Sequence, residues 1–288
     1  MHDLLGAIVL GIVEGITEFL PISSTGHLLI VEHWLGARSD LFNVGIQAGA
    51  ILAITLVYRQ RIWQLLTNWG ERANRVYLYK LILAFLITVV IGFVAVEAGF
   101  QLPTTVTPVA WALIIGGLWM LFAEWAAERI ERRRKAAGRV AVLEDGEVRY
   151  ATAGYSSTHV TWKVAILVGV AQMIAGLFPG TSRSAATIFT AMLFGTSNRS
   201  AATEFAFLVG IPTMYAATAY EAYATLKDGN AAHASWGALG VGFVVSLIVA
   251  FAAVKWLLGY IRNHRFTPFA IYRIALGIAL LLIIPMGH

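Results

Sequence analysis

Six apolar runs, each about long enough to cross a lipid bilayer, constrain this chain more than any other feature. They lie near residues 43–58, 81–100, 106–127, 205–225, 235–260 and 268–286. A helix needs about 20 apolar residues to cross a hydrocarbon core of ~30 Å, because it rises ~1.5 Å per residue. Charged residues make up 13% of the chain, whereas soluble domains carry roughly 25%. The sequence therefore predicts an all-α integral membrane protein with six full spans.

Two further apolar segments, residues 4–35 and 163–196, are interrupted by helix-breaking residues. Pro21 interrupts the first segment, and Pro179 with Gly180 interrupts the second. Non-helical backbone at membrane depth is tolerated only where protein or a water-filled cavity surrounds it. Each segment is therefore predicted to form a re-entrant helical hairpin, in which the chain enters the membrane, breaks and returns.

The order of these elements divides the chain into two repeats. Residues 1–128 hold a hairpin and three spans, residues 129–162 form a polar connector, and residues 163–288 hold a second hairpin and three spans. Because each unit has an odd number of spans, the two units are predicted to have inverted topology. Broken helices at corresponding positions of inverted repeats point to a site near the midplane of the membrane.

The two hairpins share a Pro-x-Ser/Thr-Ser core but differ in charge. Their aligned residues are Pro21, Ser23 and Ser24 with Pro179, Thr181 and Ser182. The acids Glu14 and Glu18 have no counterpart, because Gln172 and Gly176 occupy those positions. The repeat is thus expected to supply the scaffold, while the chemistry is asymmetric.

Basic residues predict the orientation of the chain in the membrane. They are concentrated in the segments 59–80, 129–139 and 262–265, whereas 97–108 has none and 227–234 has one. The positive-inside rule places the first three segments, including the connector, in the cytoplasm. Both termini are then expected outside. The net charge of +5 lies in short loops and does not indicate a nucleic-acid partner.

The first hairpin carries a pair of acids. Glu14 and Glu18 are four residues apart, so on a helix their carboxylates share one face. Two such carboxylates repel each other unless a cation or bound protons intervene. Hard oxygen donors of this kind suit Mg²⁺ or Ca²⁺. The alternative is a protonated glutamate that is hydrogen-bonded within the helix bundle.

Hydroxyl groups and a histidine follow the break at Pro21. Ser23, Ser24 and Thr25 begin the next helix, where they could cap it or bind a phosphate beside its free amides. His27 lies one turn further and is predicted to reach the same cavity, although a lone histidine on an apolar face is more often structural. Glu32 is expected at the membrane interface.

Arg183 is the most specific residue of the second hairpin. Its planar guanidinium matches phosphate oxygens in a bidentate manner. The neighbouring residues predicted to bind phosphate with it are Gly180, Ser182, Ser184 and Thr187. The alternative is an ion pair between Arg183 and Glu14 or Glu18, which would still bring the two hairpins together. Gln47, Asn43 and Glu204 are expected at most to contact the site residues, and not the substrate itself.

Three motifs together, the ExxxE acid pair, the PISSTGH loop and the PGTSRSxxT loop, resemble the bacterial undecaprenyl-diphosphate phosphatase family of the bacitracin-resistance type. The resemblance extends to FNVGIQAGAILAI, FAFLVGIPTM and PFAIYR, and so covers nearly the whole chain. It implies hydrolysis of a polyprenyl diphosphate lipid to the monophosphate carrier lipid, at the outer face of the bacterial cytoplasmic membrane. It also implies a role in cell-wall synthesis and in bacitracin resistance.

The resemblance implies that Glu14 and Glu18 are the essential acid pair, that Ser24 and His27 lie in the catalytic loop, and that Arg183 binds phosphate. The expected chemistry is metal-assisted phosphoryl transfer. The sequence leaves open whether Ser24, His27 or water attacks the phosphorus, and it leaves open the oligomeric state, a homodimer included. The rival class is a transporter or lipid flippase, since inverted repeats with broken helices are a transporter architecture.

Overall fold

The computed structural model describes residues 2–100, 105–136, 141–144, 147–150, 160–195, 198–227 and 235–283. These residues form eleven helices and one two-stranded antiparallel hairpin. The first six helices are α1 (His2–Thr17), α2 (Ser24–Leu35), α3 (Asp40–Val57), α4 (Arg59–Thr67), α5 (Arg72–Glu97) and α6 (Val106–Ala136). The others are α7 (Trp162–Leu177), α8 (Arg183–Phe194), α9 (Arg199–Lys227), α10 (Trp236–Asn263) and α11 (Thr267–Ile283).

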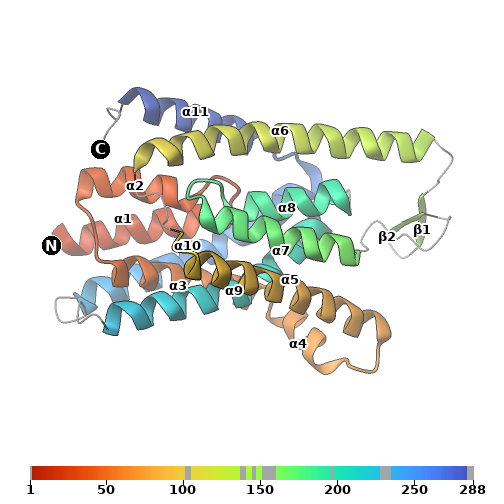
Figure 1. Cartoon of the computed structure of the whole chain (residues 1–288), viewed down its shortest axis with the longest axis horizontal. Coiled ribbons are helices and arrows are strands. Elements are labelled where there is room, and N and C mark those ends of the chain that lie inside the picture. The colour runs from red at the N-terminus through yellow and green to blue at the C-terminus, as the bar shows by residue number, and fades with distance from the viewer. Residues whose placement is uncertain are drawn as a thin grey trace.

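The long helices lie roughly parallel and form an elongated bundle (Figure 1). Helix α10 packs against α1 and α3, α5 packs against α7 and α9, and α6 packs against α11. The start of α1 and the end of α11 lie at one end of the bundle, and α4 lies toward the other end (Figure 1).

Membrane character is confirmed by length, composition and exposure. Among the described residues, α3, α5, α10 and the stretch Val106–Ile130 of α6 are long and apolar enough to span a bilayer. Large apolar side chains such as Val90 and Phe93 on α5 and Ile248 on α10 are exposed. Exposed apolar side chains on long helices fit contact with lipid rather than water.

Two of the six predicted spans do not reach the length and composition of a span. Helix α9 is long enough and continues through Pro212, but Thr, Tyr and Glu dilute its apolar residues. Helix α11 is strongly apolar but has 17 residues.

The polar segments contain a helix and a strand pair that the sequence analysis did not predict. Residues 59–67, expected in a loop, form α4. In the connector, α6 continues to Ala136, and β1 (Ala141–Glu144) pairs with β2 (Glu147–Tyr150). The Asp-Gly sequence between these strands favours a tight hairpin. The other connector residues, 137–140, 145–146 and 151–159, lie outside the described residues.

Both predicted helix breaks are present, and they have the same local conformation. Residues 18–23 separate α1 from α2, and residues 178–182 separate α7 from α8. Ser23 (φ 71°, ψ 102°) and Ser182 (φ 67°, ψ 110°) cap the second helix of each pair. They are the only non-glycine residues with positive φ in the described part of the chain. Such backbone costs about 1–3 kcal/mol and persists only where the surroundings enforce it.

These caps correct the alignment of the two hairpins. By conformation Ser23 corresponds to Ser182, whereas the sequence alignment paired it with Thr181. Ser24 and Arg183, the first residues of α2 and α8, are therefore counterparts. The backbone conformation that starts each helix sets this correspondence, and the position of the proline does not.

The tips of the two helix pairs meet in the middle of the bundle. Helices α1 and α2 approach from one end of the bundle and α7 and α8 from the other (Figure 1). The Ser184 hydroxyl donates to the Leu20 carbonyl at 3.1 Å. Gly180 (φ 92°) packs so closely on α6 that a Cβ there would lie 2.7 Å from the Val109 carbonyl oxygen. Residues far apart in the sequence are thus brought together at one point.

Candidate active site

Glu18 joins the two helix breaks. It follows the last turn of α1, where its amide still donates to the Glu14 carbonyl at 3.0 Å. Its Oε2 accepts a hydrogen bond from the Ser24 hydroxyl, and its Oε1 accepts one from the Arg183 guanidinium. The Glu18 side chain is 4% exposed and the Arg183 side chain 28%. A carboxylate, a hydroxyl and a guanidinium from both breaks therefore form one cluster.

The hydroxyls around Arg183 are used mainly within the protein. Thr187 donates to the Arg183 carbonyl at 2.7 Å and is 2% exposed. Ser184 donates to Leu20 and is 7% exposed. Ser182 caps α8 and lies 3.0 Å from the Ser184 hydroxyl. These hydroxyls are thus engaged within the protein, and Arg183 is the one charged residue of the segment 180–187.

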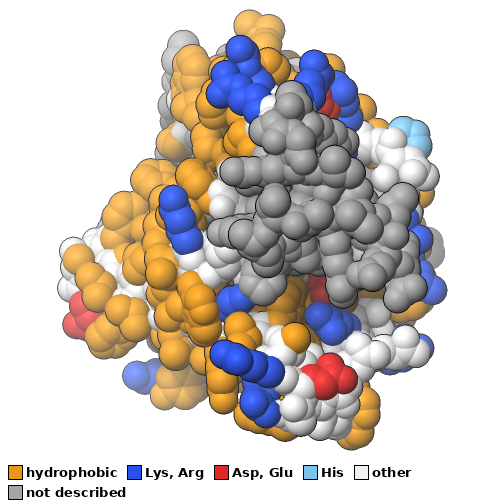
Figure 2. Space-filling model, turned by 90° about the vertical axis from the view of Figure 1, so that its right-hand side faces the viewer, with side chains coloured by type: hydrophobic (Ala, Val, Ile, Leu, Met, Phe, Trp, Pro, Cys, Tyr) orange, Lys and Arg blue, Asp and Glu red, His pale blue; other side chains and the backbone are white. Residues whose placement is uncertain are grey.

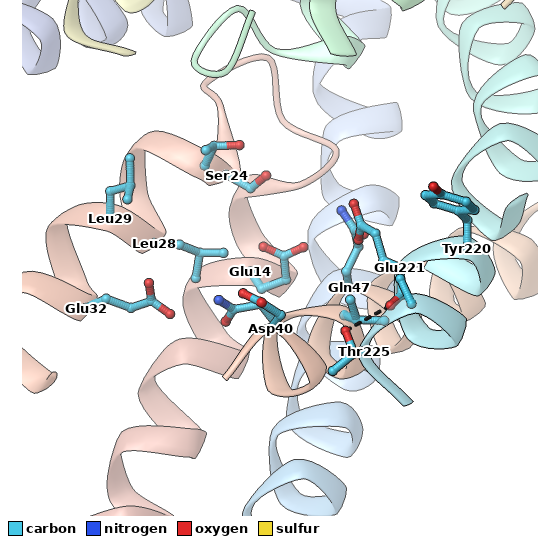
Figure 3. Close-up of a pocket in the computed structure, with 14 residues that line it drawn as sticks. Glu14, Ser24, Leu28, Leu29, Glu32, Asp40, Gln47, Tyr220, Glu221 and Thr225 are labelled. Carbon is cyan, nitrogen blue, oxygen red and sulfur yellow. Dashed lines mark hydrogen bonds between the residues drawn. The ribbon is translucent and has the colours of Figure 1, made fainter. Parts of the chain in front are cut away.

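A cavity of about 520 Å³ opens beside the first break (Figure 3). It is lined by residues of α1, α2, α3 and α9, among them the predicted site residues Glu14, Ser24, Thr25 and Gln47. Asn43, which was expected at most to contact the site residues, also lines the cavity. Ser23 is 4% exposed and does not line the cavity, and its side chain accepts a hydrogen bond from the Gly26 amide.

Three further acids line this cavity: Glu32, Asp40 and Glu221. Sequence reasoning placed Glu32 at the interface and did not single out Asp40 or Glu221. No lysine or arginine is among the described residues that line the cavity. With Glu14, the cavity therefore presents four carboxyl groups, and its walls attract cations.

Glu14 and Glu18 differ in their contacts. Glu14 is 1% exposed, and its Oε2 has no hydrogen-bond partner among the described residues. Both oxygens of Glu18 are already engaged. The described residues contain no group of three or more His, Asp or Glu side chains arranged to hold a metal ion. Glu14 thus fits a metal ligand, but the Glu14–Glu18 pair does not form a ready site.

His27 points away from the cavity. Its Nδ1 lies 2.7 Å from the Ser23 carbonyl oxygen, and its Nε2 lies 2.7 Å from the Tyr272 hydroxyl. Its ring stacks on Tyr272 at 5.6 Å between centroids. His27 is not among the residues that line the cavity, so the expectation that it reaches the space beside Ser24 does not match this conformation.

Arg273 is a buried charged residue that joins the two breaks and that sequence reasoning did not single out. It is 0% exposed and donates to the carbonyls of Gly180 and Thr181 at 2.9 Å each and of Pro21 at 3.4 Å. It also contacts the Ala112 carbonyl at 3.3 Å. Its signal in the sequence was a charge inside the apolar run 268–286, which makes a residue a candidate for a functional or structural role at membrane depth.

The remaining candidates lie around the site or far from it. Gln47 accepts a hydrogen bond from Thr218 at 3.2 Å at the cavity wall. Glu204 pairs with Arg61 at 2.9 Å and does not line the cavity. Gln172, which the sequence alignment paired with Glu14, donates to Thr213 at 2.7 Å and to Thr88 at 3.3 Å and so ties helices together.

Comparison with known proteins places this geometry in context. Residues 7–279 match the family described as bacitracin resistance protein BacA. The undecaprenyl-diphosphatase of Rhizobium johnstonii is 60% identical over 279 residues, which cover 97% of this chain and 96% of the relative. The protein of the same name from Xylella fastidiosa is 55% identical over 281 residues, or 98% of each chain. That from Xanthomonas axonopodis pv. citri is 56% identical over 285 residues, or 99% and 98%.

Proposed function

Because the chain belongs to the bacitracin resistance protein BacA family, we propose that it hydrolyses undecaprenyl diphosphate to undecaprenyl phosphate and inorganic phosphate. The match confirms the family inferred from the three sequence motifs. The product is the carrier lipid needed for cell-wall synthesis, and removal of the diphosphate counters bacitracin. One observation carries the chemistry: Ser24, Glu18 and Arg183 form a cluster beside a cavity.

The cluster supports a serine nucleophile. The Ser24 hydroxyl already donates to Glu18, which is the position of a general base. In the proposed first step, Ser24 Oγ bonds to the terminal phosphorus, its proton passes to Glu18, and undecaprenyl phosphate leaves as the bridging P–O bond breaks. Water then hydrolyses the phosphoserine and releases inorganic phosphate. His27 faces Tyr272, which makes a phosphohistidine the weaker alternative.

Arg183 is proposed to bind the terminal phosphate. Its guanidinium is bound to Glu18 in the absence of substrate, so phosphate oxygens would compete with a carboxylate for the same donors. Stabilisation of charge on the transferred group is the main requirement of phosphoryl transfer. Ser182, Thr25 and the free amides at the start of α2 and α8 would complete the phosphate site.

A divalent cation, Mg²⁺ or Ca²⁺, is part of this proposal. When bound, it would neutralise charge on the diphosphate. Of the two acids predicted as its ligands, Glu14 has a free buried oxygen in the described structure.

The proposed topology has six spans and two re-entrant hairpins in two inverted repeats, within the bacterial cytoplasmic membrane. It is supported by the matching caps at Ser23 and Ser182 and by the opposite directions of the two helix pairs (Figure 1). In this proposal the residues 1–128 and 163–288 are the repeats, joined by the cytoplasmic connector 129–162. The homodimer stays a prediction from the sequence.

The orientation follows from charge. Lysine and arginine side chains are scattered over one end of the bundle (Figure 2). The cavity is lined by residues along α2, by the start of α3 and by the end of α9, and the start of α3 and the end of α9 lie toward the other end of the bundle (Figure 1). By the positive-inside rule the cavity opens to the outer face, and both termini lie outside.

Labelling of single cysteines tests this orientation, because the chain has no cysteine of its own. A membrane-impermeant maleimide added to intact spheroplasts should label Glu221→Cys at the cavity mouth and leave Arg132→Cys unlabelled. Labelling of Arg132→Cys alone would reverse the orientation.

The enzyme is tested by phosphate release from farnesyl or undecaprenyl diphosphate by purified protein in detergent. Wild type should release phosphate, and EDTA, Ser24→Ala, Glu18→Gln and Arg183→Ala should each abolish release. Glu97→Gln removes an exposed acid at the end of α5, away from the cavity, and serves as the matched control. A folded, metal-loaded wild type that releases no phosphate would refute the enzyme.

A transporter or lipid flippase is the second candidate. It is favoured by one observation, the two broken helix pairs that enter from opposite ends and meet in mid-bundle (Figure 1). Detergent solution separates the two functions, since transport has no readout without two compartments. Movement of a labelled lipid diphosphate across proteoliposomes, with no phosphate release in detergent, would support this candidate alone.

A further inference from the structure

The cavity beside Ser24 is lined by oxygens that lack hydrogen-bond donors. Among the described residues, Glu14 Oε2, Glu32 Oε1 and Asn43 Oδ1 are buried and have no partner. They belong to α1, α2 and α3, and all three residues line the same cavity. A buried acceptor without a donor is destabilising unless a cation or a proton meets it. The walls of this cavity are therefore suited to positive charge.

Glu14 and Asn43 combine a charge with a neutral oxygen donor. Glu14 is 1% exposed, so its free oxygen is shielded from bulk water. Figure 3 shows its carboxylate directed toward the space that Ser24 and Gln47 also border. Carboxylate and amide oxygens are donors that Mg²⁺ and Ca²⁺ accept. Each Glu18 oxygen already accepts a hydrogen bond, one from Ser24 and one from Arg183, which leaves Glu18 less available to a cation than Glu14.

We infer that Glu14 and Asn43 are the protein ligands of a divalent cation in this cavity, and that Glu32, Asp40 and Glu221 form an acidic rim that draws the cation in. Glu18 is not a ligand but the partner of Ser24 and Arg183. The inference rests on the proposed function only for the role of the cation in phosphate release. It changes the metal ligands expected from the ExxxE pair.

A site with two protein ligands agrees with the rest of the structure. No group of three or more His, Asp or Glu side chains in the described residues is arranged to hold a metal ion. Mg²⁺ keeps several waters and is commonly bound by one or two carboxylates together with substrate phosphates. The acidic walls, with no lining lysine or arginine among the described residues, would repel a bare diphosphate. The cavity is therefore expected to accept the diphosphate only together with a cation.

Manganese binding measures the site without any substrate. Purified full-length protein in detergent is titrated with Mn²⁺, and free Mn²⁺ is followed by electron paramagnetic resonance. Glu14→Gln should abolish tight binding, and Asn43→Leu should weaken it about tenfold. Asn43→Asp should tighten binding, because it adds a charge at nearly the same volume. Glu32→Gln should weaken binding about threefold and reduce its dependence on salt.

Two variants decide which residues are ligands. Glu18→Gln and the exposed control Glu97→Gln should bind Mn²⁺ as wild type does. The inference is overturned if Glu18→Gln loses as much affinity as Glu14→Gln, or if Asn43→Asp and Asn43→Leu both leave the affinity unchanged. It is also overturned if wild type binds no Mn²⁺, which would leave a proton on Glu14. Mn²⁺ binding by a protein that releases no phosphate would refute the phosphatase and support the cation site.

Discussion

Replacing Arg273 by lysine should uncouple the two helix breaks. The Arg273 guanidinium is fully buried and spans the carbonyls of Pro21 in the first break and of Gly180 and Thr181 in the second. It also reaches the Ala112 carbonyl in α6. The described residues contain no carboxylate within ion-pair distance of it. Arg273 therefore contributes through the planar guanidinium, which reaches several carbonyl oxygens at once, and not through neutralisation of an acid.

The magnitude follows from the contacts that lysine cannot make. A single ammonium at the end of a flexible stem can reach the carbonyls of one break but not of both, so about two of the four carbonyl contacts are lost. Hydrogen bonds to a charged group are worth about 1.5–3 kcal/mol each. Loss of two contacts at the lower of these values should reduce the free energy of unfolding by about 3 kcal/mol. A shift of ~1 Å between Ser24 and Arg183 would lower the rate about 100-fold.

The assay compares Arg273→Lys with Arg265→Lys. Arg265 is 60% exposed and pairs with Glu128 at 2.8 Å, so its replacement should cost about 0–1 kcal/mol and leave activity intact. Denaturant unfolding in mixed micelles gives the change in stability, and phosphate release gives the change in rate. An Arg273→Lys protein that is as stable and as active as Arg265→Lys would refute the proposal that the Arg273 guanidinium joins the two breaks.

Three further predictions test the local geometry and the chemistry. Gly180→Ala should destabilise the protein by about 2 kcal/mol, because φ is 92° and the new Cβ would lie 2.7 Å from the Val109 oxygen; Gly240→Ala, which meets nothing within 4 Å, should be neutral or stabilising in the same unfolding assay. Ser24→Ala should lose the phosphoenzyme that rapid quenching in sodium dodecyl sulfate at neutral pH traps in wild type, whereas His27→Gln should retain it; the reverse pattern would make His27 the nucleophile. EDTA should stop phosphate release, and added Mg²⁺ or Ca²⁺ should restore it; activity that is unaffected by EDTA would exclude the cation.

Local sequence patterns were sufficient for the class of fold and for singling out the residues Ser24, Glu18 and Arg183, which the structure brings together. The lengths of the apolar runs predicted a helical membrane protein, because the thickness of the hydrocarbon core sets the length of a membrane-spanning helix. Proline and glycine within apolar sequence predicted both breaks, which the structure has at residues 18–23 and 178–182. Ser24 was singled out as a hydroxyl after the first break and Arg183 for its match to phosphate, and in the structure both bind Glu18.

The partners of these groups depended on how the helices pack. The ExxxE spacing shows that Glu14 and Glu18 share a helix face, but Arg183, 165 residues further on, binds Glu18 and leaves Glu14 free. His27 turns to Tyr272 because α11 lies beside α2, which no local pattern reveals. Arg273, the acidic rim and the cavity likewise arise from helices that are distant in the sequence. Periodicity and breakers act over a few residues, whereas these contacts follow from the relative positions of whole helices.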